Sequence, residues 1–178
     1  KKNKFYKLDK KVTGESSKSK INRVTKILNK KKIDYLFVSA GENVCWLMNI
    51  RGKDLPNSPV ANCNIILTKD KKIYFFSKFK KISKIKVKFN NKKIFFYEEQ
   101  KLFEILRFIK PGKFCIDKKT CSIFNEEIIK SNFIIKENVD PIYYLKSIKN
   151  KTEIKNMIQA HIEDGVALTR FLYWIKNI

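Results

Sequence analysis

Glu42-Asn43-Val44-Cys45-Trp46-Leu47-Met48-Asn49-Ile50-Arg51-Gly52-Lys53-Asp54-Leu55-Pro56-Asn57-Ser58-Pro59-Val60 is the stretch around which this chain is organised. It holds one of two Trp, one of four Arg and two of four Pro in a lysine-rich sequence. Residues 42–48 predict a short helix, which Asn49 can end because asparagine tolerates the left-handed backbone conformation. Gly52, which permits a backbone angle closed to other residues, and Pro56 and Pro59 predict a following loop of one fixed shape.

This loop carries two groups of opposite charge, the guanidinium of Arg51 and the carboxylate of Asp54. In one interpretation it is a surface turn in which the two side chains pair with each other, a contribution of about 0.2–1 kcal/mol when exposed. In the other, a rigid loop that presents both groups is a binding edge, since binding residues often lie on loops held by a scaffold.

Outward from this stretch, the composition indicates a globular domain. The chain has 178 residues, of which 43% are hydrophobic and 13% aromatic, enough for a core. No apolar run approaches the roughly 20 residues of a membrane-spanning helix, and the lysine-rich start is not followed by the apolar stretch of a signal peptide. We expect a soluble, cytoplasmic protein that does not bind membranes.

The net charge of +23 raises the possibility of a nucleic-acid partner. However, 36 of the 40 basic residues are Lys, which lacks the planar fork that recognises phosphates and bases, and these lysines are spread over the whole chain. We therefore expect no specific nucleic-acid binding. Residues 78–88, a basic amphipathic helix or edge strand, are the best candidate for an RNA or membrane contact, against the simpler interpretation of a solvated helix face.

Residues that could form a catalytic or metal site are few. The four cysteines have no paired two-residue spacing, and the chain has a single histidine, His161. We expect free thiols, with Cys45, Cys63 and Cys115 buried as small hydrophobic residues. No zinc ribbon or redox motif is therefore indicated, and His161 is expected to be a packed or capping residue rather than part of a metal site with Glu163 and Asp164.

Helical and strand patterns alternate along the chain, which favours an α/β fold. Strands are predicted at 33–39, 62–67, 73–76, 94–97, 114–116 and 133–135, the second and third forming a hairpin. Besides the helix at 42–48, helices are predicted from a cap in 14–17 to the lysines at 30–32, and at 102–109, 122–130 and 140–145. Residues 1–14 show no periodic pattern and predict a linker from an upstream domain.

The last helix is the longest element. Asn150 and Glu153 form a capping box, and apolar residues mark one face of a helix of about 26 residues. Such a face needs a covering partner, and the sequence stops inside the helix without a glycine cap. We therefore expect a piece of a larger protein, with a domain at 15–146 and the start of a second domain at 147–178.

Three motifs in the same order resemble the three-domain Xaa-Pro aminopeptidases (aminopeptidase P). They are residues 14–17, residues 45–60 and the tail from Asp140 to Leu168. The resemblance implies the middle, creatinase N-terminal-like domain followed by the start of the catalytic domain. Its fold would be an α/β structure with a mixed sheet of about six strands and flanking helices, followed by the long helix that begins a pita-bread domain.

The same resemblance implies a function for the whole protein, removal of the N-terminal residue from peptides with proline in the second position. Two divalent metal ions, usually manganese, would be held by two Asp, one His and two Glu of the catalytic domain. Since none of these ligands has a counterpart here, this piece should be inactive alone and shape the substrate channel and the domain assembly. A homodimer is also implied.

In that setting the loop residues acquire expected roles. Arg51 would bind a peptide carbonyl or carboxylate at the mouth of the active site or at a domain interface. Asp54 would hold Arg51 or receive a substrate ammonium, Asn49 would brace the turn, and Trp46 would belong to the core. The alternatives are a pseudoenzyme that shares the fold, or a basic α/β module that binds RNA or a protein partner.

Overall fold

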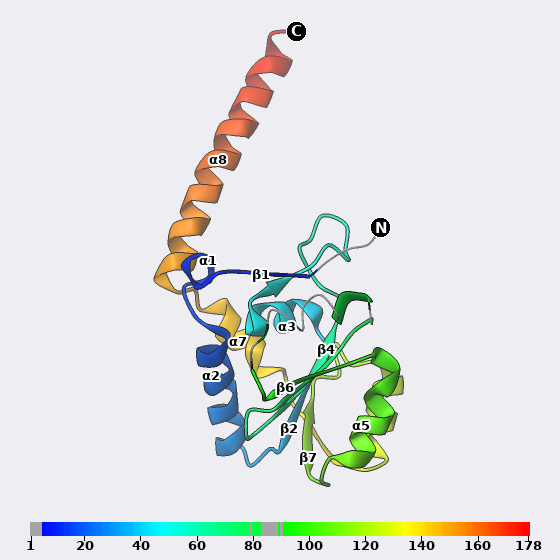
Figure 1. The fold of residues 1–178 in the computed structure, drawn as a ribbon. Helices are drawn as coiled ribbons and strands as arrows, with labels where there is room; N and C mark the ends of the chain where they lie inside the picture. The colour runs from blue at the N-terminus through cyan, green and yellow to red at the C-terminus, as the bar shows by residue number, and fades with distance from the viewer. Residues whose placement is uncertain (1–4, 79, 83–88, 90) are drawn as a thin grey trace.

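A mixed sheet of six strands forms the centre of the protein, for which a computed structural model describes residues 5–78, 80–82, 89 and 91–178 (Figure 1). The strand order is β6-β5-β4-β2-β7-β8. β4 runs antiparallel to both of its neighbours, and the other pairs are parallel. The predicted mixed sheet is confirmed, and each predicted strand is present: β2 (Tyr35–Val38), β4 (Asn64–Thr68), β5 (Ile73–Phe76), β6 (Ile94–Tyr97), β7 (Lys113–Ile116) and β8 (Ile134–Glu137).

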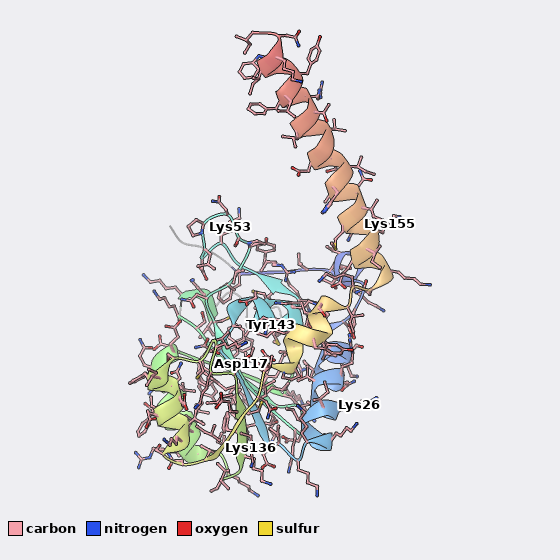
Figure 2. The ribbon with its side chains drawn as sticks, turned by 180° about the vertical axis from the view of Figure 1, so that it is seen from behind. Lys26, Lys53, Asp117, Lys136, Tyr143 and Lys155 are labelled. Carbon is pink, nitrogen blue, oxygen red and sulfur yellow. The ribbon has the colours of Figure 1, made fainter. Side chains whose placement is uncertain are left out.

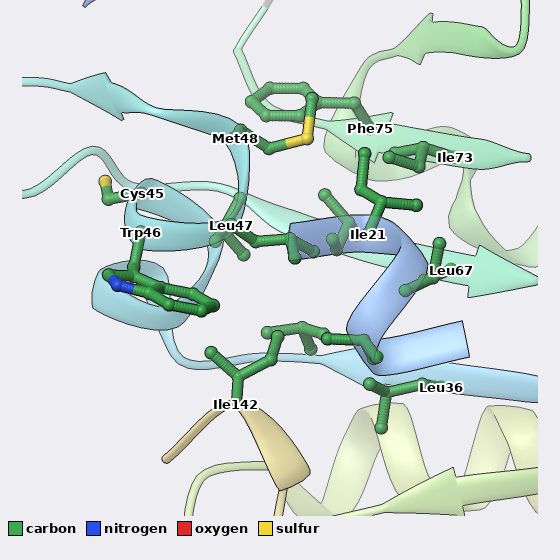
Figure 3. Close-up of a cluster of buried hydrophobic side chains, with 14 of the residues drawn as sticks. Ile21, Leu36, Cys45, Trp46, Leu47, Met48, Leu67, Ile73, Phe75 and Ile142 are labelled. Atoms are coloured by element: carbon green, nitrogen blue, oxygen red, sulfur yellow. The ribbon is translucent and has the colours of Figure 1, made fainter. Parts of the chain in front are cut away.

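Helices cover both faces of this sheet. Strand residues alternate between the faces, so in β4 the side chains of Ile65 and Leu67 join one buried cluster and that of Ile66 joins the other. The first cluster is covered by α2 (Ser17–Lys30), α3 (Gly41–Met48) and α7 (Pro141–Ser147), and Figure 3 shows part of it. The second cluster is covered by α5 (Leu102–Phe108) and α6 (Ile123–Lys130), with a short 3-10 turn, η1 (Glu99–Lys101), before α5.

Folded structure extends into the segment that the sequence predicts as a linker. β1 (Tyr6–Lys7) pairs antiparallel with β3 (Ile50–Arg51), and α1 (Lys10–Thr13) follows. Phe5 is buried, and its ring lies edge-on at 6.2 Å from that of Phe75. A strand of two residues and a helix of four are too short to show a period in the sequence, so the described part of the predicted linker lies folded against the domain.

The last helix, α8 (Lys151–Lys176), extends away from the domain (Figure 1). The predicted length of 26 residues and the capping box of Asn150 and Glu153 are both confirmed. Not one residue of α8 is buried. Its apolar residues are largely exposed, among them Ile158, Ile162, Leu168 and Trp174.

Two predictions concern segments of high charge or hydrophobicity. The basic segment predicted at 78–88 lies for the most part outside the described residues. Within the described ranges, no helix combines the length and hydropathy that crossing a membrane requires.

Candidate binding groove beside Arg51

Arg51 lies half-buried at the end of β3, directly after helix α3. One guanidinium nitrogen donates to the carbonyl of Cys45 at 3.2 Å and to that of Ile50 at 2.8 Å. Cys45 is in the last turn of α3, where carbonyls carry the negative end of the helix dipole. The arginine is therefore held in place by backbone carbonyls through one of its nitrogens.

Asp54 has partners other than the arginine. Among the described residues its carboxylate accepts from the Lys81 ammonium at 2.5 Å and from the Asn62 amide at 2.7 Å, and the side chains of Asp54 and Lys81 are only 9% and 16% exposed. The expectation that Asp54 holds Arg51 is thus wrong. The backbone gives the reason, because Gly52 and Asp54 donate to the carbonyls of Pro59 and Val60, so the loop folds back and Asp54 faces the returning chain.

The loop folds back on itself through its backbone hydrogen bonds, and the role of Gly52 in it differs from the predicted one. A Cβ atom at Gly52 would lie 2.8 Å from the Cα of Ala61, so this position needs glycine for close approach of two backbone segments. The expected unusual backbone angle is found instead at Asn57, where φ is 58°, next to the bridge between Leu55 and Ser58 at the loop tip.

Asn49 ends α3 in the left-handed conformation, with φ of 52° and ψ of 42°, as predicted. Its side chain is buried and donates to the Thr13 hydroxyl at 3.2 Å and to the Glu15 carbonyl at 2.8 Å. Its amide oxygen accepts from the Lys20 ammonium at 2.8 Å. Asn49 therefore joins the loop to the N-terminal segment and to α2.

Lys20 is a buried cation that the sequence analysis missed. The side chain is 1% exposed, and its ammonium donates to the Trp46 carbonyl at 3.0 Å and lies 4.2 Å from the centre of the indole ring. Burial lowers the pKa of Lys20 to about 8, although the negative charges of Glu153 and Glu15 act to raise it. The sequence did contain an indication of this burial. Lys20 lies four residues before the apolar Val24, which places both on the buried side of α2.

An open groove of about 390 Å³ lies beside Arg51. Figure 2 shows the loop that carries Lys53 and the first turns of α8 that carry Lys155, both rising from the same end of the domain. The lining combines apolar side chains with cations and anions: Val12, Glu42, Cys45, Trp46, Arg51, Pro59, Val60, Lys146, Lys149, Glu153, Asn156 and Met157.

Two charged side chains of the groove lining already have partners within the domain. Lys146 donates to the Asn43 amide oxygen at 2.6 Å, and burial lowers its pKa. Glu42 accepts from the Tyr143 hydroxyl at 3.0 Å. With these partners fixed, Arg51 is the lining cation whose planar fork suits a carbonyl or a carboxylate.

Other ionisable groups of the domain have structural positions. Asp140 caps α7 by accepting from the Ile142 amide at 2.9 Å, and burial raises its pKa to about 6. Burial also raises the pKa of Cys115 and Cys121 to about 11. Over the described part of the chain, no group of three or more His, Cys, Asp or Glu could hold a metal ion, so its residues do not fit a dinuclear centre.

Comparisons with known proteins place this geometry in a family. The sequence profile of the Creatinase/Prolidase N-terminal domain matches residues 1–153. The chain is 33% identical to Xaa-Pro aminopeptidase 1 of Dictyostelium discoideum over 178 residues, which cover 99% of this chain and 28% of the relative. It is 32% identical to the Xaa-Pro aminopeptidase ApepP of Drosophila melanogaster, covering 98% and 29%. The chain thus spans less than a third of the length of these relatives.

Solved structures share the fold. The X-prolyl aminopeptidase of Caenorhabditis elegans, a cytosolic enzyme with a di-nuclear active site, superposes with a TM-score of 0.86 at 23% identity over 98% of this chain and 30% of its own. A proline dipeptidase of Streptococcus agalactiae gives a TM-score of 0.55 at 14% identity, over 71% of this chain and 97% of its own. The resemblance to Xaa-Pro aminopeptidases is confirmed, and the chain belongs to the creatinase/prolidase N-terminal domain family.

Proposed function

We propose that this chain is the non-catalytic middle portion of an Xaa-Pro metalloaminopeptidase, which removes the N-terminal residue from peptides with proline in the second position. The observation that carries the proposal is the similarity to Xaa-Pro aminopeptidases over 99% of the chain. In this proposal the catalytic chemistry lies outside these residues, which correspond to 28% of that relative. By itself the 178-residue piece is inactive.

The contribution of this portion is to shape the substrate channel and the domain assembly. In this proposal the domain of residues 15–146 and residues 147–178, the start of a pita-bread catalytic domain, both contribute side chains to the groove lining, among them Arg51 and Glu153. Arg51 binds a peptide carbonyl or carboxylate, while Asp54 and Asn49 keep the arginine loop in one shape through Lys81 and Lys20.

The remaining features of the complete protein follow from the same proposal. The complete protein would hold a pair of divalent ions, manganese by the habit of the family, in its catalytic domain, where they would supply Lewis-acid chemistry for peptide hydrolysis. The complete protein acts in the cytoplasm as a homodimer on peptide substrates, without a specific nucleic-acid partner and without membrane association.

The test is an assay of the complete protein with manganese on two peptides that differ only in having proline or alanine at the second position. We expect cleavage of the proline peptide alone and its loss on chelation of the metal. Arg51→Ala should raise KM about tenfold or more, because a charged hydrogen bond to the peptide is lost.

Arg107→Ala is the matched control, since Arg107 is an exposed arginine on α5, away from the groove lining. Arg51→Lys, which keeps the charge and removes the fork, guards against an effect on folding. Cleavage of both peptides at equal rates would overturn the peptidase assignment. Unchanged kinetics in both Arg51 variants would overturn only the role of the groove.

A further inference from the structure

The base of α8 makes specific contacts with the N-terminal segment. The Asn150 side chain donates to the Thr13 carbonyl at 2.9 Å, and the Asn156 side chain donates to the Val12 carbonyl at 3.0 Å. Val12 and Thr13 belong to the last turn of α1, whose carbonyls lack partners within the helix. Two side-chain amides of α8 therefore satisfy the open end of α1.

The N-terminal segment is in turn tied to the interior of the domain. Leu8 donates its amide to the Asn49 carbonyl at 2.8 Å, and the Thr13 hydroxyl accepts from the Asn49 side chain. Asn49 accepts from the buried Lys20. A continuous set of hydrogen bonds thus connects the base of α8 to a side chain in the core.

At this junction Gly14 packs so closely against Asn150 that no larger residue fits there. Its φ is 70°, a conformation that favours glycine, and a Cβ atom there would lie 2.2 Å from the Asn150 amide oxygen. That oxygen also accepts from the Glu153 amide at 3.0 Å, as the N-cap of α8. Asn150 can therefore give way only by losing the cap that starts the helix.

Since α8 buries no residue of its own, these contacts at its base carry an unusual share of its attachment. We infer that residues 9–14 act as a clasp that fixes the direction of α8 on the domain. The clasp also shapes the groove beside Arg51, because Val12, Glu153 and Asn156 are among the side chains that line it. The clasp lies within the 178-residue chain and does not depend on peptidase activity.

The experiment measures the spread of distances between two spin labels, one on α2 and one on α8. The labels replace the exposed Lys26 and Arg170 in a Cys121→Ser background, where Cys45, Cys63 and Cys115 are buried. The test variant combines Asn150→Asp and Asn156→Ala. Aspartate keeps the acceptor of the N-cap and loses the donor to Thr13, so the cap survives while the clasp opens.

We expect a narrow distance distribution for the parent chain and one at least twice as wide for the test variant. The matched control combines Asn177→Asp and Gln159→Ala, whose side chains bond within or at the end of α8, to Tyr173 and Glu163. Equal widths in the test and control variants would overturn the inference. The single change Asn156→Ala, at an exposed position, repeats the test should the double variant unfold, with the same two outcomes.

Discussion

Lys20 is a buried cation at the centre of the hydrogen bonds that hold the arginine loop. Its ammonium is bound by the Trp46 carbonyl, the Asn49 side chain and the face of the Trp46 ring. These partners are neutral, and Glu15 and Glu153 act on it only through their charge. The loss of hydration on burial therefore outweighs the stabilising interactions, which lowers the pKa.

This lowered pKa predicts a particular dependence of stability on pH. In the unfolded chain Lys20 keeps its proton up to about pH 10.5, whereas in the folded chain it loses it near pH 8. Between these values the unfolded state binds more protons, so the free energy of unfolding gains up to about 1.4 kcal/mol per pH unit as pH rises. Lys20→Met should lack this gain.

Urea unfolding of the parent and of Lys20→Met at pH 7.5, 8.5 and 9.5 would measure the difference. The buried thiols titrate with raised pKa values in both proteins, so their effect cancels in the comparison. Parallel pH profiles for the two proteins would show that Lys20 keeps its ordinary pKa in the folded state.

Asn49, the C-cap of helix α3, contributes more than the backbone conformation that ends the helix. Asn49 supplies both the left-handed conformation and three side-chain hydrogen bonds to other segments. Glycine at this position would keep the first property and lose the second. The two contributions can therefore be separated by one substitution.

We expect Asn49→Gly to lower the free energy of unfolding by about 2–4 kcal/mol, because Lys20 and Thr13 lose buried partners. The matched control is Asn57→Gly. Asn57 lies exposed at the loop tip and has a similar backbone angle, with φ of 58°. That change should stay within about 0.5 kcal/mol. Chemical denaturation measures both, and equal effects would mean that only the backbone conformation of Asn49 matters.

The molecule as a whole divides into a packed α/β domain and a helix that stands outside it. The two buried clusters flank the sheet, while α8 contributes no buried residue. Stability is therefore concentrated in the domain, and the far end of α8 has only its own hydrogen bonds to hold it.

Removal of residues 161–178 should accordingly leave the free energy of unfolding of the domain within about 0.5 kcal/mol of the parent value. The contrasting change is Phe5→Ala in the N-terminal segment, where the buried ring packs on Phe75 and its loss should cost about 3 kcal/mol. Both values come from urea titrations followed by circular dichroism. A large loss on truncation would contradict this division.

The regular elements could be predicted because their signals are local. The six sheet strands, the capping box of α8 and the left-handed Asn49 each follow from residues within one element or turn. Rare residues also marked the loop beside Arg51, and the binding role of that arginine stays a prediction. The wrong partner for Asp54 came from a local argument about a contact that is not local.

By itself, then, the amino-acid sequence determined the elements, their order and the family resemblance, because period, capping and motif spacing are properties of neighbouring residues. Tertiary structure alone decided the pairing of Asp54 with Lys81, the burial of Lys20 and the folding of the N-terminal segment under α8. Each of these joins residues at least 26 positions apart in the chain. Such contacts depend on how the elements pack. Lys20 at least lies on the apolar face of α2, whereas a two-residue strand and a four-residue helix carry no local mark of their packing.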